Sequence, residues 1–111
     1  MSSNLELIQQ EIPENAIRAC AAAMSVAIAV TDEELVTARR GMFGFGKKVK
    51  RYPLENLANV TLTQNPHADL LALDFSNGED LFLMFKPESR TGAERIVKLL
   101  RSRMSRNAGQ P

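Results

Sequence analysis

The dipeptide Asn77-Gly78 constrains the fold of this chain more than any other local feature. Apolar residues dominate on both sides of it, over residues 69–75 and 80–86. Asparagine and glycine accept the positive φ angles of a tight type I′ turn, and such a turn joins two antiparallel strands. The sequence therefore predicts a β-hairpin near the C-terminus of the chain.

This hairpin is expected to be apolar on both faces. A two-residue turn places Leu71 opposite Met84 and Leu73 opposite Phe82, and the other face then carries Leu70, Ala72, Leu81, Leu83 and Phe85. A bulged turn would exchange the two faces, and both would still be apolar. Each apolar face of such a sheet has to be buried against another element, and the protein core buries one of them. We expect the cover of the other face to be either the N-terminal helix, through Leu5, Ile8 and Ile12, or a second copy of the protein.

Five further strands are predicted before the hairpin. Residues 35–39, 47–52 and 57–64 carry β-branched or alternating apolar side chains, and a loop with three glycines joins the first two. The alanine-rich stretch 16–31 is ambiguous, because alanine favours a helix whereas Val26, Ile28 and Val30 alternate as in a strand. We predict two strands, over 16–23 and 25–31, with a single helix over 15–25 as the alternative.

Helices are predicted at both ends of the chain. Asn4 can cap a short helix that ends before Pro13. Near the C-terminus, Thr91 to Glu94 fits a capping box, and an apolar face follows at helical spacing: Ala93, Ile96, Val97, Leu100 and Met104. We expect this long helix to cover the open end of the strands.

The segment 39–51 is the strongest candidate for a contact surface. The chain has a net charge of only +1, yet six of its 14 basic residues fall here. Any attraction for a polyanion must therefore come from this local cluster of bases. The candidate contact residues are Arg39, Arg40, Phe43, Phe45, Lys47, Lys48, Lys50 and Arg51. The hairpin is either a solvated loop, a contact for an anionic membrane surface, or a contact for protein or nucleic acid. Nucleic acid is the least favoured partner, because a loop offers a small platform for stacking bases.

Two phosphate- or RNA-binding motifs resemble parts of this segment but do not fit it. Gly41 to Lys48 approaches a phosphate-binding P-loop, which must lead into a helix. Here a strand-like run follows, and Pro53 closes it. The run Gly41-Met42-Phe43-Gly44 mimics the GXXG loop of KH domains, but that loop joins two helices. We expect neither activity.

Composition and isolated residues argue against an enzyme. His67 stands in a turn without a partner nucleophile or a second ligand, and we predict no catalytic residue, no cofactor and no metal site. Cys20 is the only cysteine, which excludes an intrachain disulfide, and we expect it to be a small buried residue. The most apolar run, residues 19–30, is too short to span a membrane, and acids replace a basic leader at the N-terminus. We expect a cytoplasmic protein that is not transmembrane.

The chain resembles the bacterial pleckstrin-homology-like (PH-like) domains of the YokE-like class. The resemblance rests on Val26 to Thr31, Gly41 to Gly44, Tyr52-Pro53-Leu54 with Leu57 and Val60, the Asn77-Gly78 hairpin and the final helix. It implies a mainly-β fold, with a seven-stranded, partly open antiparallel barrel capped by a C-terminal α-helix. Residues 1–13 would form an N-terminal helix or arm, 14–106 the PH-like domain and 107–111 a disordered tail.

From these observations we predict a non-enzymatic binding module. Its basic hairpin would contact an anionic membrane surface or anionic ligand. The alternative is a protein-interaction or homo-oligomeric assembly domain that uses the apolar face of the last hairpin.

Overall fold

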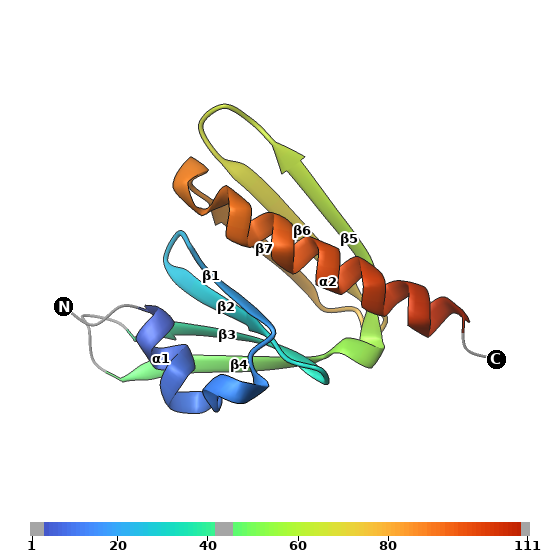
Figure 1. Ribbon diagram of the computed structural model, residues 1–111, viewed down its shortest axis with the longest axis horizontal. Helices are drawn as coiled ribbons and strands as arrows, with labels where there is room; N and C mark the ends of the chain where they lie inside the picture. The colour runs from blue at the N-terminus through green and yellow to red at the C-terminus, as the bar shows by residue number, and fades with distance from the viewer. Residues whose placement is uncertain (1–3, 42–45, 110–111) are drawn as a thin grey trace.

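The computed structural model describes residues 4–41 and 46–109, and within them seven antiparallel strands form two sheets (Figure 1). The first sheet contains β1 (Ala19–Ala23), β2 (Val26–Val30), β3 (Glu34–Arg40) and β4 (Lys47–Pro53), in that order. The second contains β5 (Leu57–Gln64), β6 (Asp69–Phe75) and β7 (Asp80–Phe85). Helices α1 (Asn4–Glu11) and α2 (Arg90–Gly109) flank the strands, and short 3-10 turns lie at Glu14–Ala16, Leu54–Asn56 and Pro87–Ser89. The predicted mainly-β class with two terminal helices is confirmed, but the strands do not close into a barrel.

The alanine-rich segment forms strands, as predicted, and not a helix. Ala23 pairs with Val26 across a two-residue turn, in which Ser25 takes a left-handed conformation with φ 68°. The amide of Met24 in this turn donates a 2.7 Å hydrogen bond to the carbonyl of Met84. One corner of the first sheet is thereby tied to the second sheet.

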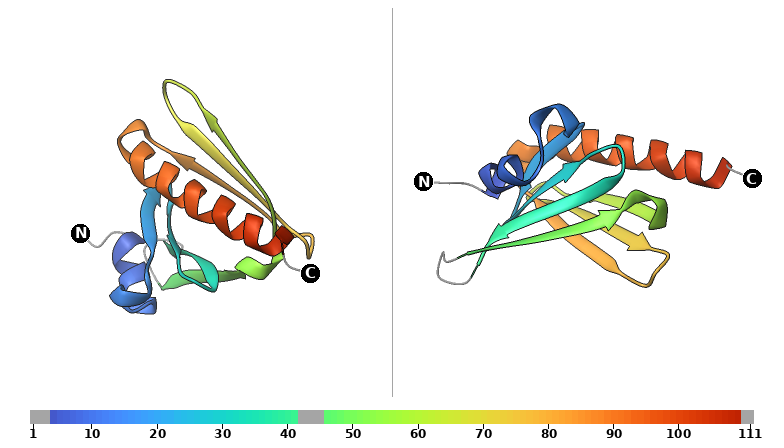
Figure 2. Two further views of the ribbon diagram at one scale, coloured as in Figure 1. Left: turned by 45° about the vertical axis from the view of Figure 1, so that its right-hand side comes forward. Right: turned by 90° about the horizontal axis from the view of Figure 1, so that it is seen from below.

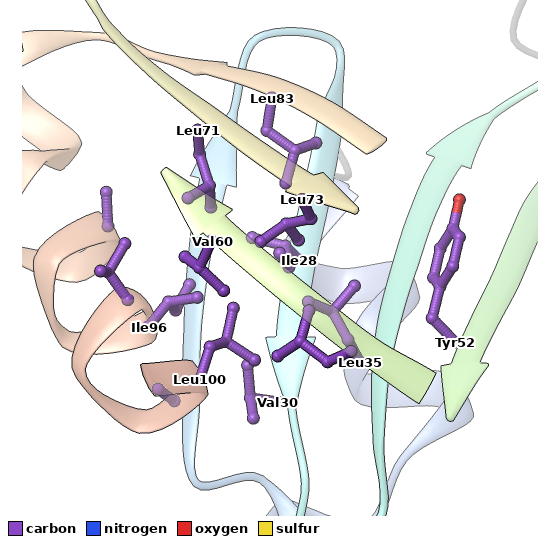
Figure 3. Close-up of a cluster of buried hydrophobic side chains, with 14 of the residues drawn as sticks. Ile28, Val30, Leu35, Tyr52, Val60, Leu71, Leu73, Leu83, Ile96 and Leu100 are labelled. Carbon is purple, nitrogen blue, oxygen red and sulfur yellow. The ribbon is translucent and has the colours of Figure 1, made fainter. Parts of the chain in front are cut away.

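The main core lies between the two sheets and α2 (Figure 3). Ile96 and Leu100 of α2 are fully buried there, and they point toward Val60 of the second sheet. The helix also packs closely on β1, because a Cβ added at Gly92 would lie only 3.1 Å from the Cβ of Ala21. Small residues on both elements permit this approach.

Two local predictions about α2 and β1 are wrong. The helix begins at Arg90, after a 3-10 turn, so Thr91 lies inside its first turn and not at the N-cap. Cys20 is exposed, because successive side chains of a strand point to opposite faces and its neighbours Ala19 and Ala21 take the core side.

Helix α1 covers the outer face of the first sheet (Figure 2). Its buried residues Leu7 and Ile8, with Ile12 just after it, pack on small or β-branched side chains of β2 and β3: Ala27, Ala29, Val36 and Ala38. The central strands β2 and β3 are therefore buried on both faces under α1, where Ala27, Ala29 and Ala38 leave room for the helix. The prediction that this helix covers the last hairpin is wrong.

The last hairpin forms over the predicted residues, but with a different register. Three residues, 76–78, separate Phe75 from Glu79, and only Gly78 takes a positive φ (93°). This is a bulged turn and not the two-residue type I′ turn. Leu71 therefore pairs with Leu83 instead of Met84, and the two faces exchange. The outer face carries Leu70, Ala72, Phe82 and Met84, so both faces are apolar, as expected.

Candidate functional site

The register of β3 and β4 divides the predicted basic patch between two faces of the first sheet. Arg39 lies opposite Lys48, and Arg40 lies opposite Lys47. Because side chains alternate along a strand, each pair belongs to a different face. Arg39, Lys48 and Lys50 share the face of the buried Tyr52, whereas Arg40, Lys47 and Arg51 share the face that α1 covers. Phe43 and Phe45, the other two predicted contact residues, lie outside the described residues.

The bases on the α1 face hold that helix in place. Lys47 Nζ lies 2.5 Å from Glu11 Oε1 at the end of α1, and Arg51 pairs with both Glu11 (3.8 Å) and Glu34. The Lys47 ammonium, which donates a hydrogen bond to Glu11, lowers the pKa of that carboxyl. On the same side, the Arg40 amide donates a 3.3 Å hydrogen bond to Asn4 Oδ1 at the start of α1. The charges of Lys47 and Arg51 are thus already matched by acids of the protein.

The bases on the other face line a groove of about 610 Å³ between the edge strands β4 and β7. Its β3–β4 wall is basic, whereas its β7 wall, together with Val26, is apolar. The lining residues are Val26, Thr37, Arg39, Lys48, Lys50, Tyr52, Leu81, Phe82 and Leu83, together with Lys47 and Val49, which alternation places on the α1 face of the edge strand β4. The groove therefore offers positive charge and apolar surface to the same ligand.

Lys50 links the two walls of this groove. Its Nζ lies 2.8 Å from Glu79 Oε2, in the turn before β7, and 5.0 Å from the centre of the Tyr52 ring. The Glu79 carboxylate, which accepts a hydrogen bond from Lys50, raises the pKa of Lys50. Tyr52 in turn stacks on Phe75, with ring centres 5.0 Å apart and planes 19° from parallel. Lys50 thus connects the two walls of the groove, and Glu79 partly neutralises its charge.

Arg39 and Lys48 are the bases of the groove whose charge is not matched by an acid among the described residues. They are exposed and directly opposite each other on neighbouring strands, and neither makes an ion pair within residues 4–41 and 46–109. Like charges in this cross-strand position repel. An anion bound between the two side chains would remove that repulsion.

Sequence reasoning missed the apolar wall of the groove. Thr37 and Tyr52 could be placed there by strand alternation once β3 and β4 were paired. The β7 residues Leu81 to Leu83, in contrast, lie some thirty positions away in sequence and reach the groove only through the packing of the two sheets. No local pattern links them to the basic segment.

A second arginine site serves the fold. Arg90, at the start of α2, donates hydrogen bonds to both carboxylate oxygens of the fully buried Asp69, at 2.8–3.2 Å, and one of 2.7 Å to the carbonyl of Asn65. The Arg90 hydrogen bonds lower the pKa of Asp69. The paired hydrogen bonds between Arg90 and Asp69 attach α2 to the start of β6. No sequence motif predicted this contact.

The described part of the chain contains no group of three or more histidine, cysteine, aspartate or glutamate side chains arranged to hold a metal ion. His67 lies exposed in the turn between β5 and β6. None of the described helices combines the length and the apolar character that crossing a bilayer requires.

Comparison with known proteins adds no family assignment. No protein-family model matches the chain, and no curated protein matches it at a significant level. The function proposed below therefore rests on the geometry of the groove.

Proposed function

We propose that this protein is a non-enzymatic binding module that holds the headgroup of an anionic phospholipid at a membrane surface. The observation that carries the proposal is the pair Arg39 and Lys48, directly opposed and unmatched by any acid of the described chain. Opposed like charges on a sheet cost up to about 1 kcal/mol, which a bound phosphate would offset. The apolar β7 wall supplies a surface for the glycerol and acyl part of the lipid.

We further propose that the chain is a PH-like domain of the YokE-like class. The support is the strand order, four plus three, followed by a C-terminal helix packed into the core. The resemblance implies that the β3–β4 hairpin lies at the open pole, where eukaryotic relatives bind lipid headgroups. The expected location is the cytoplasmic face of a membrane. Relative to the sequence prediction, the proposed contact moves from the whole hairpin to its groove face.

Vesicle co-sedimentation tests the proposal. The chain is expected to bind vesicles that contain phosphatidylglycerol, to bind pure phosphatidylcholine vesicles weakly, and to lose affinity as salt rises. Each base near an anionic leaflet contributes about 1 kcal/mol. The double variant Arg39→Gln/Lys48→Gln should therefore bind about thirtyfold more weakly.

A matched control separates the groove from general charge. Lys98→Gln/Arg101→Gln removes the same charge from exposed positions of α2 and should bind like the wild type. Equal losses in both double variants would refute the groove. A response to soluble glycerol phosphate by NMR, without any vesicle binding, would replace the membrane with a free anion as the ligand.

A further inference from the structure

The outer face of the second sheet exposes a contiguous apolar surface. Phe82 is 64% exposed, Met84 44% and Leu70 36%. They are cross-strand neighbours, because Leu70 pairs with Met84 and Ala72 with Phe82. Met24, 44% exposed, adjoins them through its hydrogen bond to Met84. Large apolar side chains gathered in this way mark an interaction surface.

Both helices of the structure are engaged elsewhere. Helix α1 covers the outer face of the first sheet, and α2 packs on the inner side of the second (Figures 1 and 2). Helix α1, one of the two covers expected for this face, is therefore packed elsewhere, and the described elements leave the face exposed.

The charges around the apolar surface are arranged with opposite signs at its two ends. Asp74 and Asp80 lie opposite each other at the end near the turn. At the other end stands Lys86, exposed, in extended conformation and without an ion pair in the described chain. Along β7 the outward positions thus read acid, Phe82, Met84, base. Asp74, through a shared hydrogen bond, raises the pKa of Asp80, which reflects the crowding of the two carboxyls.

This pattern is complementary to itself, and we propose that the face binds a second copy of the chain. A twofold axis that lies midway between the two facing sheets, parallel to them and perpendicular to the strands, stacks β7 on β7 in opposite directions. Phe82 then meets Met84 of the second copy, and Asp80 meets Lys86 of the second copy. An axis parallel to the strands would instead stack acids on acids. The charge order selects the first arrangement.

The size of the face sets the strength of the dimer. Three strands about 4.8 Å apart and about seven residues long span roughly 14 by 23 Å. That is smaller than the half-interface of a typical stable complex, about 800 Å². The dimer is therefore weak and forms at micromolar or higher concentration.

Sedimentation equilibrium of the full chain, from about 5 to about 500 µM, tests this inference. The wild type is expected to pass from monomer to dimer within this range. Phe82→Ser, which removes the largest apolar side chain of this face from both copies, should weaken the dimer more than tenfold. Lys98→Asp, on the exposed side of α2, makes the same charge change as the variant Lys86→Asp described next, and it should leave the dimer intact.

Charge exchange provides the sharper test. Asp80→Lys and Lys86→Asp should each weaken self-association, because each removes the opposed pair. The double variant Asp80→Lys/Lys86→Asp should restore it. An equimolar mixture of the two single variants should form a heterodimer, because their ends are again of opposite sign. A wild type that stays monomeric to 500 µM overturns the inference, as does a dimer that ignores Phe82→Ser or is not restored by the exchange. Because Phe82 also lines the groove, only the exchange of Asp80 and Lys86, which do not line it, separates this inference from vesicle binding.

Discussion

The two faces of the β3–β4 hairpin carry three bases each, but these bases have different surroundings. On the α1 face, Lys47 and Arg51 pair with acids at the end of that helix and on β3. On the groove face, Arg39 and Lys48 oppose each other without an acid of the described chain. Bases that are neighbours in sequence therefore have different surroundings. Lys47 and Arg51 take part in the protein's own packing, whereas Arg39 and Lys48 are the bases on which the proposed anion contact rests.

The largest loss of stability is expected from removing the apolar contact between α1 and the first sheet. Ile8 is 1% exposed, and Ile8→Ala leaves a cavity under α1, which should lower the free energy of unfolding by about 2–4 kcal/mol. Urea unfolding at low protein concentration measures it. Phe82→Ala, at the 64% exposed position beside the groove, should change stability by less than about 0.5 kcal/mol. If the two variants are equally stable, α1 does not contribute as the packing implies.

The paired and unpaired bases should respond to neutralisation with opposite signs. Lys47→Gln/Arg51→Gln breaks ion pairs that are partly exposed, and it should destabilise the protein by up to about 1 kcal/mol. Arg39→Gln/Lys48→Gln removes a cross-strand repulsion and should stabilise it by a few tenths, up to about 0.5 kcal/mol. Both double variants carry the same net charge, so each is the other's control. Thermal and urea unfolding at low salt show whether each double variant gains or loses stability. A loss of stability in both variants would mean that the groove bases also stabilise the fold.

The smallest effect is the pH dependence of stability that comes from the Glu11–Lys47 pair on the α1 face. Lys47 lowers the pKa of Glu11 in the folded protein, so this carboxyl stabilises the fold above its unfolded pKa of about 4.3. That stability is lost as the pH falls through the folded pKa. The stability difference between the wild type and Glu11→Gln should therefore shrink from pH 7 to pH 3. In the background Lys47→Gln, the difference should depend less on pH, and an unchanged dependence would contradict the role of this pair.

Local patterns predicted the elements of this fold well. Alternating side chains located β5 and β6 at the observed residues. In the alanine-rich segment, the alternation of Val26, Ile28 and Val30 and the hairpin that follows indicated strands. The register of the last hairpin was missed, because Asn-Gly also occurs in a bulged turn and one extra loop residue changes every pairing. The position of α1 was missed for a different reason. Its apolar face fits any apolar surface, and only the small side chains of β2 and β3 leave room for it.

The sequence by itself determined the strands, the two helices and the existence of a basic hairpin beside an apolar one. Those features follow from the spacing of apolar side chains and from the residues that favour turns, and both act over a few residues. Only the tertiary structure decided which bases are matched and which are available, because alternation separates neighbours in sequence and sheet packing brings β4 beside β7. The segment 39–51 is thus not one patch. It is a helix-docking face and a groove face, and the groove face, with Arg39 and Lys48, carries the proposed function.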